Sequence, residues 1–337
     1  MHIEENKSLR RYNTFGIDGE ARYFVSVTTI DELKGALSSN VHSEKFILGG
    51  GSNMLLTKNI DALVIHVALK GISITSENDN EVFVTAKAGE NWHEFVQYCI
   101  SKNYGGIENL SLIPGNVGTA PIQNIGAYGV ELKDTFHSCH AVHVSTRQER
   151  DFTKSECQFG YRDSIFKNAE KNNYIITSVT FRLTKKEHAL NTGYGAIQAE
   201  LEKQHCDKPT IADVANAVIA IRQSKLPDPN VLGNSGSFFK NPVIDIDAFR
   251  ELRTQFPEAP FYEISPTEYK IPAGWLIEAA GFKGYRQGHA GVHKNQALVL
   301  VNHGNATGAE IWALAMKVQH AVREKFGILI EPEVNVF

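Results

Sequence analysis

A segment of 16 residues, 114–129, restricts the fold of this chain more than any other part of its sequence (PGNVGTAPIQNIGAYG). Its four glycines and two prolines exclude a helix, and its composition is not that of a flexible linker. A structural loop of the omega type is one interpretation. A loop that needs this much backbone control is more often a cradle for a ligand, so the segment favours a binding function.

Helix and strand patterns do not alternate regularly along the chain, which favours an α+β fold over one doubly wound sheet. Helices are expected at residues 29–38, 91–102, 210–224 and 307–326, where a capping residue precedes an amphipathic run. Strands are expected at residues 23–27, 45–48, 62–66, 82–88, 138–144, 174–183, 296–301 and 328–330. The length of 337 residues allows two or three domains, and the prolines of 225–229 mark the best boundary.

Composition and charge exclude several classes of protein. A formal net charge of −4 leaves no dominant basic surface, so we expect no nucleic-acid partner. No apolar run approaches the ~20 residues that span a bilayer, and the polar N-terminus does not resemble a signal peptide. The four cysteines are far apart and form no CxxC pair, which indicates reduced thiols in a cytoplasmic protein. His289 and His293 stand among glycines rather than on a helix, so we expect no metal site.

A second glycine-rich segment, residues 49–53 (GGGSN), follows an expected strand directly. Successive backbone N–H groups of such a segment can bind a pyrophosphate, although a tight turn explains the glycines about equally well. Met54 occupies the last glycine position of a G-x-G-x-x-G pattern, so the Rossmann fingerprint is absent.

Two more motifs place reactive side chains in turns. Arg162 lies between Tyr161 and Asp163, and a surface Arg–Asp pair would explain it without any function. Ser237 lies in residues 233–242 (GNSGSFFKNP), which suggests a serine presented on a constrained turn. The spacing does not fit a nucleophile elbow, and no catalytic triad can be assigned, but a serine hydroxyl can also relay a proton.

Taken together, these segments resemble the UDP-N-acetylenolpyruvoylglucosamine reductase family, in its longer form with a tyrosine loop. The resemblance covers residues 12–16, 49–53, 113–129, 160–167, 226–242, 273–278 and 331–334. It implies an FAD-binding fold of the vanillyl-alcohol-oxidase type in two subdomains, plus a separate α+β substrate-binding domain. The implied boundaries are 1–66, with the strand 327–337 returning to it, 67–226, and 227–326.

The resemblance also implies an activity in bacterial peptidoglycan precursor synthesis. NADPH, as co-substrate, reduces a non-covalently bound FAD, which then reduces UDP-N-acetylglucosamine enolpyruvate to UDP-N-acetylmuramate. Such a conjugate reduction needs stabilisation of negative charge on the carboxylate and a positioned acid. A cytoplasmic monomer is expected, with small-molecule partners only and no membrane partner.

Residue by residue, the resemblance assigns three catalytic roles. Ser237 matches the proton donor, Arg162 the guanidinium that holds the carboxylate, and Glu333 the catalytic glutamate, with Glu331 as the alternative glutamate. The positions that match the cofactor cradle are Gly49, Gly50, Gly51, Ser52, Asn53, Gly115, Gly118, Pro121, Ile122, Gln123, Asn124, Gly126, Ala127 and Tyr128. The positions that match the substrate-binding residues are Tyr194, Lys225, Asn241, Tyr262 and Gln296.

Two other functions are considered. Another FAD oxidoreductase of the same fold would be favoured by the loss of Ser237 or Glu333, but both residues are present. A non-catalytic nucleotide-sugar sensor would keep Tyr194 and Lys225 and lose the catalytic residues, which this chain retains.

Overall fold

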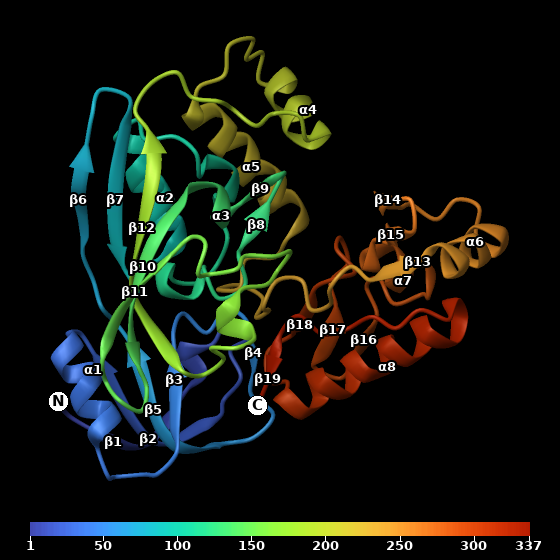
Figure 1. The fold of residues 1–337 in the computed structure, drawn as a ribbon. Helices are drawn as coiled ribbons and strands as arrows, with labels where there is room; N and C mark the ends of the chain where they lie inside the picture. The colour runs from blue at the N-terminus through green and yellow to red at the C-terminus, as the bar shows by residue number, and fades with distance from the viewer. The chain divides into compact units, whose positions relative to one another are not determined.

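The computed structural model describes all residues, 1–337, and the chain forms two compact units (Figure 1). Unit 1 comprises Met1–Lys7, Ala21–Gly50 and Asp61–Ser224, and unit 2 comprises Ser8–Glu20, Gly51–Ile60 and Lys225–Phe337. Each unit therefore gathers three separate stretches of chain. The last change of unit falls after Ser224, next to the two prolines that follow the helix there. The division into three domains stays a prediction.

The first sheet of unit 1 has four strands in the order β1-β2-β5-β3. Its strands are β1 (Glu4–Ser8), β2 (Glu20–Val27), β3 (Lys45–Leu48) and β5 (Ile60–Val67). Helix α1 (Ile30–Ser38) buries Leu33 and Leu37 in one cluster with Val25 and Ile65 of this sheet. β3 runs parallel to β5, and its carboxyl end leads directly into the glycines of residues 49–51.

The second sheet of unit 1 is antiparallel, with the order β11-β10-β12-β7-β6. Its strands are β6 (Ile72–Glu77), β7 (Glu81–Lys87), β10 (Phe136–His143), β11 (Glu149–Thr153) and β12 (Tyr174–Thr184). Helix α2 (Trp92–Ser101) lies against this sheet (Figure 1), where the rings of Trp92 and Phe95 contact Phe181 of β12. These buried rings belong to the hydrophobic core that α2 and the second sheet share, and their packing holds the helix against the sheet.

The glycine-rich segment of unit 1 and the residues around it form short 3-10 helices, two-residue strands and one short α-helix. They are η2 (Glu108–Leu110), η3 (Val117–Thr119), β8 (Gly126–Ala127), β9 (Val130–Glu131), α3 (Leu132–Thr135) and η4 (Ile165–Lys167). Helices α4 (Gly195–Lys203) and α5 (Ile211–Lys225) pack through Ile197, Leu201, Val214 and Val218. Tyr128 packs against this same cluster, so α5 lies next to the end of the glycine-rich segment.

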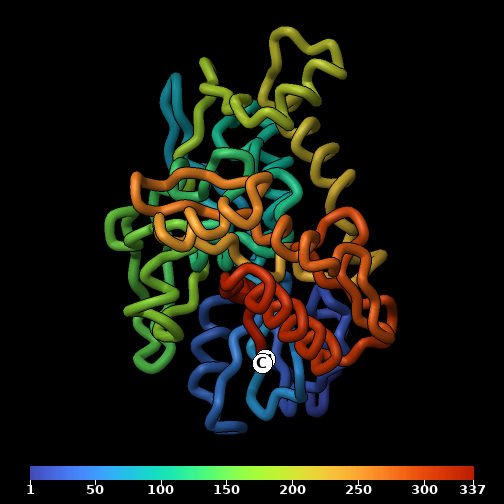
Figure 2. Tube along the Cα trace, turned by 90° about the vertical axis from the view of Figure 1, so that its right-hand side faces the viewer, coloured from blue at the N-terminus to red at the C-terminus, as the bar shows by residue number.

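Unit 2 has two three-stranded sheets, one two-stranded sheet (β19-β4) and three α-helices. One sheet, β13-β15-β14, contains β13 (Val243–Asp245), β14 (Tyr262–Ser265) and β15 (Glu268–Lys270), with α6 (Ile246–Gln255) beside it. The other, β16-β17-β18, contains β16 (Arg286–Gln287), β17 (Ala290–Val292) and β18 (Leu300–Asn302), with α7 (Ala273–Ala279) and α8 (Gly308–Phe326). α8, red in Figure 2, contacts β17, β18 and α7. The unit also contains η1 (Arg10–Tyr12), β4 (Met54–Leu55) and β19 (Asn335–Val336).

All four predicted helices are confirmed, and the cap of α8 is the clearest case. Thr307 and Glu310 form the reciprocal capping box, and Gly327 ends the helix in the left-handed conformation, at φ 68°. No helix of the chain combines the length and the apolar character needed to cross a membrane.

Two predicted strands are wrong. Only the end of 296–301 is a strand, because residues 296–299 form a turn in which the Val299 N–H donates to the Gln296 carbonyl. Residues 328–330 form no strand. The terminal strand is β19, five residues further on, where it pairs in parallel with β4. Apolar periodicity alone did not detect either shift, because both segments are apolar runs too short to define a register.

Candidate active site

The two glycine-rich segments meet inside unit 1. A Cβ atom on Gly50 would lie 2.8 Å from Asn116 Oδ1 and 3.0 Å from Gly115 Cα, and one on Gly49 would lie 2.6 Å from Thr119 Cγ2. Gly118 lies equally close to Ala88, whose carbonyl accepts its N–H. Close approach of chain to chain therefore requires glycine at these positions. The two segments therefore lie against each other, and the cofactor cradle that the resemblance implies stays a prediction.

The remaining residues of the first glycine segment belong to unit 2. A Cβ on Gly51 would overlap the carbonyl of Tyr12. Asn53 donates from Nδ2 to the carbonyl of Glu333 at 3.3 Å, and its own carbonyl accepts from Asn335. Asn53 thus holds the C-terminal segment in place, a role that the sequence pattern did not reveal.

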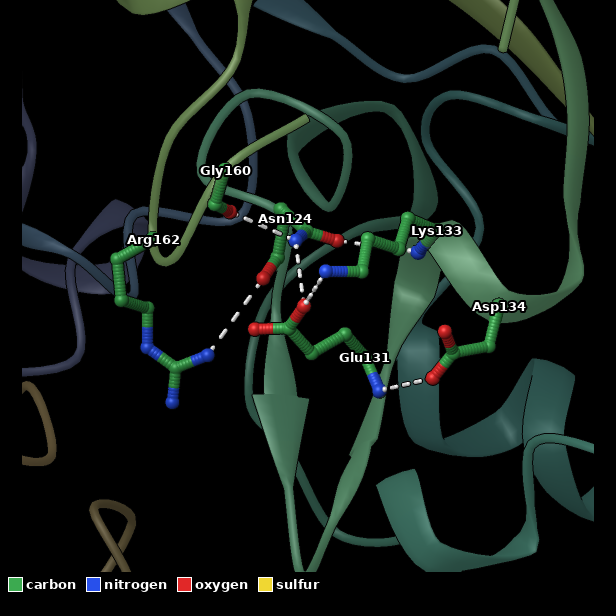
Figure 3. Close-up of polar contacts among 6 residues, drawn as sticks. All are labelled: Asn124, Glu131, Lys133, Asp134, Gly160 and Arg162. Atoms are coloured by element: carbon green, nitrogen blue, oxygen red, sulfur yellow. Dashed lines mark hydrogen bonds and ion pairs between the residues drawn. The ribbon is translucent and has the colours of Figure 1, made fainter. Parts of the chain in front are cut away.

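Asn124 is a buried hub in the second half of the glycine-rich segment (Figure 3). Its Nδ2 group donates to the Gly160 carbonyl at 2.9 Å and to Glu131 Oε2 at 3.2 Å, and its Oδ1 accepts from the Lys133 N–H at 3.0 Å. Its backbone is left-handed, at φ 45°. Both amide hydrogens of the side chain are engaged within the chain, so the side chain has no free donor for a cofactor. Its cofactor contact stays a prediction.

Arg162 projects from a tight turn that Asn124 holds in place. Gly160 and Asp163 exchange backbone hydrogen bonds, and Arg162 takes a left-handed conformation between them, at φ 53°. Its Nη2 donates to the Gly126 carbonyl at 2.6 Å, and its Nη1 lies 3.5 Å from the Asn124 carbonyl. Asn168 binds the Asp163 carboxylate. The turn therefore directs the guanidinium to the glycine-rich segment, which a simple surface Arg–Asp pair would not require.

Tyr128 and Tyr194 also meet in unit 1. Their ring centroids are 5.5 Å apart in an edge-to-face arrangement. Tyr194 precedes α4 and is 47% exposed, whereas burial raises the pKa of Tyr128. Arg222 of α5, a residue that the sequence motifs did not identify, acts against this effect of burial and lowers the pKa of Tyr128. The exposed Tyr194 ring thus lies against Tyr128, whose hydroxyl is more buried.

Several buried polar atoms around this part of unit 1 have no partner within the chain. They are Asn109 Oδ1, Ser111 Oγ and Arg222 Nε. Asn109 nevertheless donates from Nδ2 to the Tyr128 carbonyl, and the N–H of Leu112 is held by His93. Buried polar groups are nearly always hydrogen-bonded in a complete protein. Unsatisfied donors and acceptors next to a glycine cradle therefore fit a bound polar cofactor such as FAD.

The backbone brings Ser237 and Glu333 together in unit 2. Phe238, the residue after Ser237, donates to the Leu298 carbonyl at 2.7 Å and accepts from the N–H of Glu333 at 2.8 Å. Ser237 itself is exposed. A left-handed Gly236, at φ 68°, forms the turn before it, and Asn234 Oδ1 accepts the N–H of that glycine. The predicted constrained turn is confirmed, and it presents the serine beside the C-terminal segment.

The predicted substrate-binding residues occupy separate places. Asn241 and Gln296 both lie at the start of α7, because Asn241 Oδ1 accepts from Ala273 and Gln296 Oε1 is close to Gly274. Tyr262 is 53% exposed on β14, with Lys270 Nζ over its ring, and Lys225 is exposed at the end of α5. Their contacts with a ligand stay predictions.

Comparison with known proteins identifies the family. Residues 228–337 match the family model described as UDP-N-acetylenolpyruvoylglucosamine reductase, C-terminal domain, and residues 21–150 match the FAD binding domain. The UDP-N-acetylenolpyruvoylglucosamine reductase of Flavobacterium johnsoniae is 61% identical over 336 residues and covers 100% of both chains. That of Chromobacterium violaceum is 49% identical over 99% of this chain and 98% of its own.

A solved structure gives the same result. The crystal structure of UDP-N-acetylenolpyruvylglucosamine reductase from Thermus caldophilus matches with a TM-score of 0.69 and 25% identity, covering 100% of this chain and 99% of that one. The predicted α+β class, the FAD-binding fold and the resemblance are confirmed, and the tyrosine-loop form stays a prediction. The 61% identity with the Flavobacterium johnsoniae protein over the whole length shows that the chain belongs to the UDP-N-acetylenolpyruvoylglucosamine reductase family.

Proposed function

We propose that this chain is the FAD-dependent oxidoreductase that reduces UDP-N-acetylglucosamine enolpyruvate to UDP-N-acetylmuramate with NADPH in peptidoglycan precursor synthesis. The observation that carries this proposal is the 61% identity, over the whole of both chains, with a relative of that name. FAD, when bound, accepts a hydride from NADPH and passes it to the enolpyruvyl group. The small-molecule partners follow from this reaction, and a cytoplasmic monomer is the form in which we expect the chain to work.

The residues of unit 1 supply positive charge. We assign Arg162 to the carboxylate of the enolpyruvyl group, because negative charge builds there when the double bond is reduced. Two backbone carbonyls fix the guanidinium, at 2.6 Å and 3.5 Å, so little side-chain freedom is lost when the carboxylate binds. The cradle of residues 49–53 and 115–128 is the proposed FAD-binding region.

The residues of unit 2 supply the proton. We assign Ser237 Oγ as the donor to the α carbon and Glu333 as its acidic neighbour, which helps to stabilise the enol-like state. The hydrogen bond between Glu333 and Phe238 supports this pairing, because it keeps the two residues in neighbouring backbone positions. Glu331 has a partner of its own, since its carboxylate lies 3.8 Å from Lys240 Nζ. Glu333 pairs through its backbone with the residue next to Ser237, whereas Glu331 pairs with Lys240, three residues from the serine, and this favours Glu333 over Glu331.

The test separates the two half-reactions. Purified protein should carry a yellow flavin that acid precipitation releases into the supernatant. NADPH should bleach it, and the enolpyruvyl sugar should restore the colour with formation of UDP-N-acetylmuramate, followed by mass spectrometry. Bleaching without reoxidation by this sugar would favour another flavin oxidoreductase, and protein without flavin would contradict the proposal.

A further inference from the structure

Arg222 is an arginine of α5 whose charge has no counterpart in the chain. Its Nε atom is buried and has no hydrogen-bond partner. No aspartate or glutamate pairs with the guanidinium, and Tyr128, which packs against the α5 cluster, is the group that favours its charge. Burial lowers the pKa of Arg222, Tyr128 opposes this effect, and the positive charge of Arg162 adds to it.

Such an arrangement is unfavourable in a protein without ligands. A buried charge is normally paired, because its hydration is lost on burial. Here the charged group that acts on Arg222, Arg162, has the same sign. Burial lowers the pKa of His93, and the charge of Arg222 adds to this effect. The neighbouring core positions of α5, Val218 and Ile221, show that this helix face accepts apolar residues. Packing alone therefore does not account for a guanidinium at this place.

We propose that Arg222, together with Arg162, binds an anionic group of a ligand, and that Tyr128 positions the Arg222 guanidinium for this contact. The inference rests on the proposed function, which brings two anionic ligands to the protein. One is the acceptor with its carboxylate, and the other is FAD with its diphosphate.

The surroundings of Arg222 favour the acceptor carboxylate. Arg162, which we assign to that carboxylate, is bonded to the Gly126 carbonyl, two residues before Tyr128, and Tyr128 packs against the cluster of α5. The ring of Tyr128 contacts Tyr194, which we assign to the nucleotide end of the same ligand. Two guanidinium groups on one carboxylate would supply the negative charge that the half-buried Arg222, with its buried Nε atom, lacks.

The experiment uses the full-length holoprotein and the variant Arg222→Met, which keeps much of the side-chain volume and removes the charge. Binding of UDP-N-acetylglucosamine enolpyruvate and of UDP-N-acetylglucosamine, which lacks the carboxylate, is followed by the change in flavin absorbance. A charged hydrogen bond contributes ~1.5–3 kcal/mol, so affinity for the first ligand should fall roughly 10- to 100-fold, with the second nearly unchanged. Arg22→Met, at an exposed position of unit 1, is the matched control and should change neither.

Two further measurements decide the source of the anion and the role of Tyr128. A comparable fall in FAD affinity, read from flavin fluorescence after dilution, with acceptor binding unchanged, would assign the anion to the cofactor. Tyr128→Phe removes the hydroxyl but keeps the ring on Tyr194, so it should act in the same direction with a smaller effect. Should Arg222→Met fail to fold, Arg222→Lys replaces it, and the same selective loss is expected, to a smaller extent.

Unchanged affinity for FAD and for the enolpyruvyl sugar would overturn the proposal, whether or not the melting temperature falls, because a structural arginine would affect stability alone. An equal loss for the two UDP-sugars, with FAD unaffected, would overturn the assignment to the carboxylate, because the diphosphate is the anionic group that both sugars share. Failure of the proposed function is a separate outcome. It would appear as wild-type protein that does not turn over the enolpyruvyl sugar, while the FAD measurement still decides whether Arg222 binds an anion.

Discussion

The turns that carry Arg162 and Ser237 are built around the same device but use it differently. Each depends on one buried asparagine that makes three hydrogen bonds, Asn124 in unit 1 and Asn234 in unit 2. Asn124 reaches 36 residues along the sequence to Gly160, whereas all three bonds of Asn234 join residues at most seven positions away. One asparagine connects two distant segments, and the other shapes a single local turn.

The difference shows where each turn gets its rigidity. The Arg162 turn is held by side chains, since Ser164 also donates from Oγ to the Ile122 carbonyl at 2.6 Å. The Ser237 turn is held mainly by backbone, because Phe238 is bonded to Leu298 on one side and to Glu333 on the other. Substitutions around Arg162 should therefore disturb its position more than equivalent ones around Ser237.

The largest expected effect is at Ser237 itself. If Ser237 donates the proton, Ser237→Ala should leave flavin reduction by NADPH nearly intact. Reoxidation by the enolpyruvyl sugar should slow by roughly 10²–10⁴-fold, the range for a positioned acid. Stopped-flow flavin absorbance on each half-reaction measures this, since a steady-state rate does not show which step is affected.

Ser237→Cys is the matched variant, because a thiol can still donate a proton. It should recover part of the rate of reoxidation. Equal slowing of both half-reactions, or of neither, would contradict the assignment. Since backbone bonds hold this turn, loss of the hydroxyl alone should not unfold the protein.

The next effect is at Asn124. Asn124→Ala leaves the Lys133 N–H without its partner, at roughly 1–3 kcal/mol for a buried group left unsatisfied, and removes the bond that joins Asn124 to the Gly160 carbonyl. We expect a free energy of unfolding lower by about 2–3 kcal/mol in urea titration. The KM for the enolpyruvyl sugar should also rise, because the Arg162 turn loses its connection to the glycine-rich segment. Normal stability with normal KM would show that Asn124 does not hold the turn.

Asn234→Ala is the direct counterpart, and its effect should be smaller. The turn it shapes is near solvent, with Val231 85% exposed, so water can replace part of the lost bonding. We expect a loss of about 1 kcal/mol in the free energy of unfolding, and a rate of reoxidation close to that of the wild type. If the rate of reoxidation fell as far as in Ser237→Ala, the backbone hydrogen bonds of Phe238 to Leu298 and Glu333 would not be enough to position the serine.

The two turns also differ in how much of each could be predicted from the sequence. The glycine-rich segments and the Ser237 turn were recognisable, because glycine and proline restrict the backbone locally. Asn124 was predicted only as a cofactor contact. Its role as a hub was missed, because a sequence does not show that Gly160 comes close enough to accept one of its amide hydrogens. Arg222 was missed altogether, because it lies in an ordinary helical pattern and its unpaired charge is visible only in three dimensions.

The smallest effect is expected at Glu331, the alternative to Glu333 as the catalytic glutamate. The Glu331 side chain is 66% exposed and its pair with Lys240 spans 3.8 Å, so it contributes roughly 0–1 kcal/mol. Glu331→Gln should leave stability and both half-reactions unchanged within error. Glu333→Gln, which has the same change of charge two residues away, should slow reoxidation by roughly 10²-fold or more, since it removes a charge next to the proton donor. Both variants keep the backbone bonds to residues 238–240, so any difference between them reports on the carboxylates alone. If Glu331→Gln slows reoxidation and Glu333→Gln does not, the catalytic glutamate is Glu331.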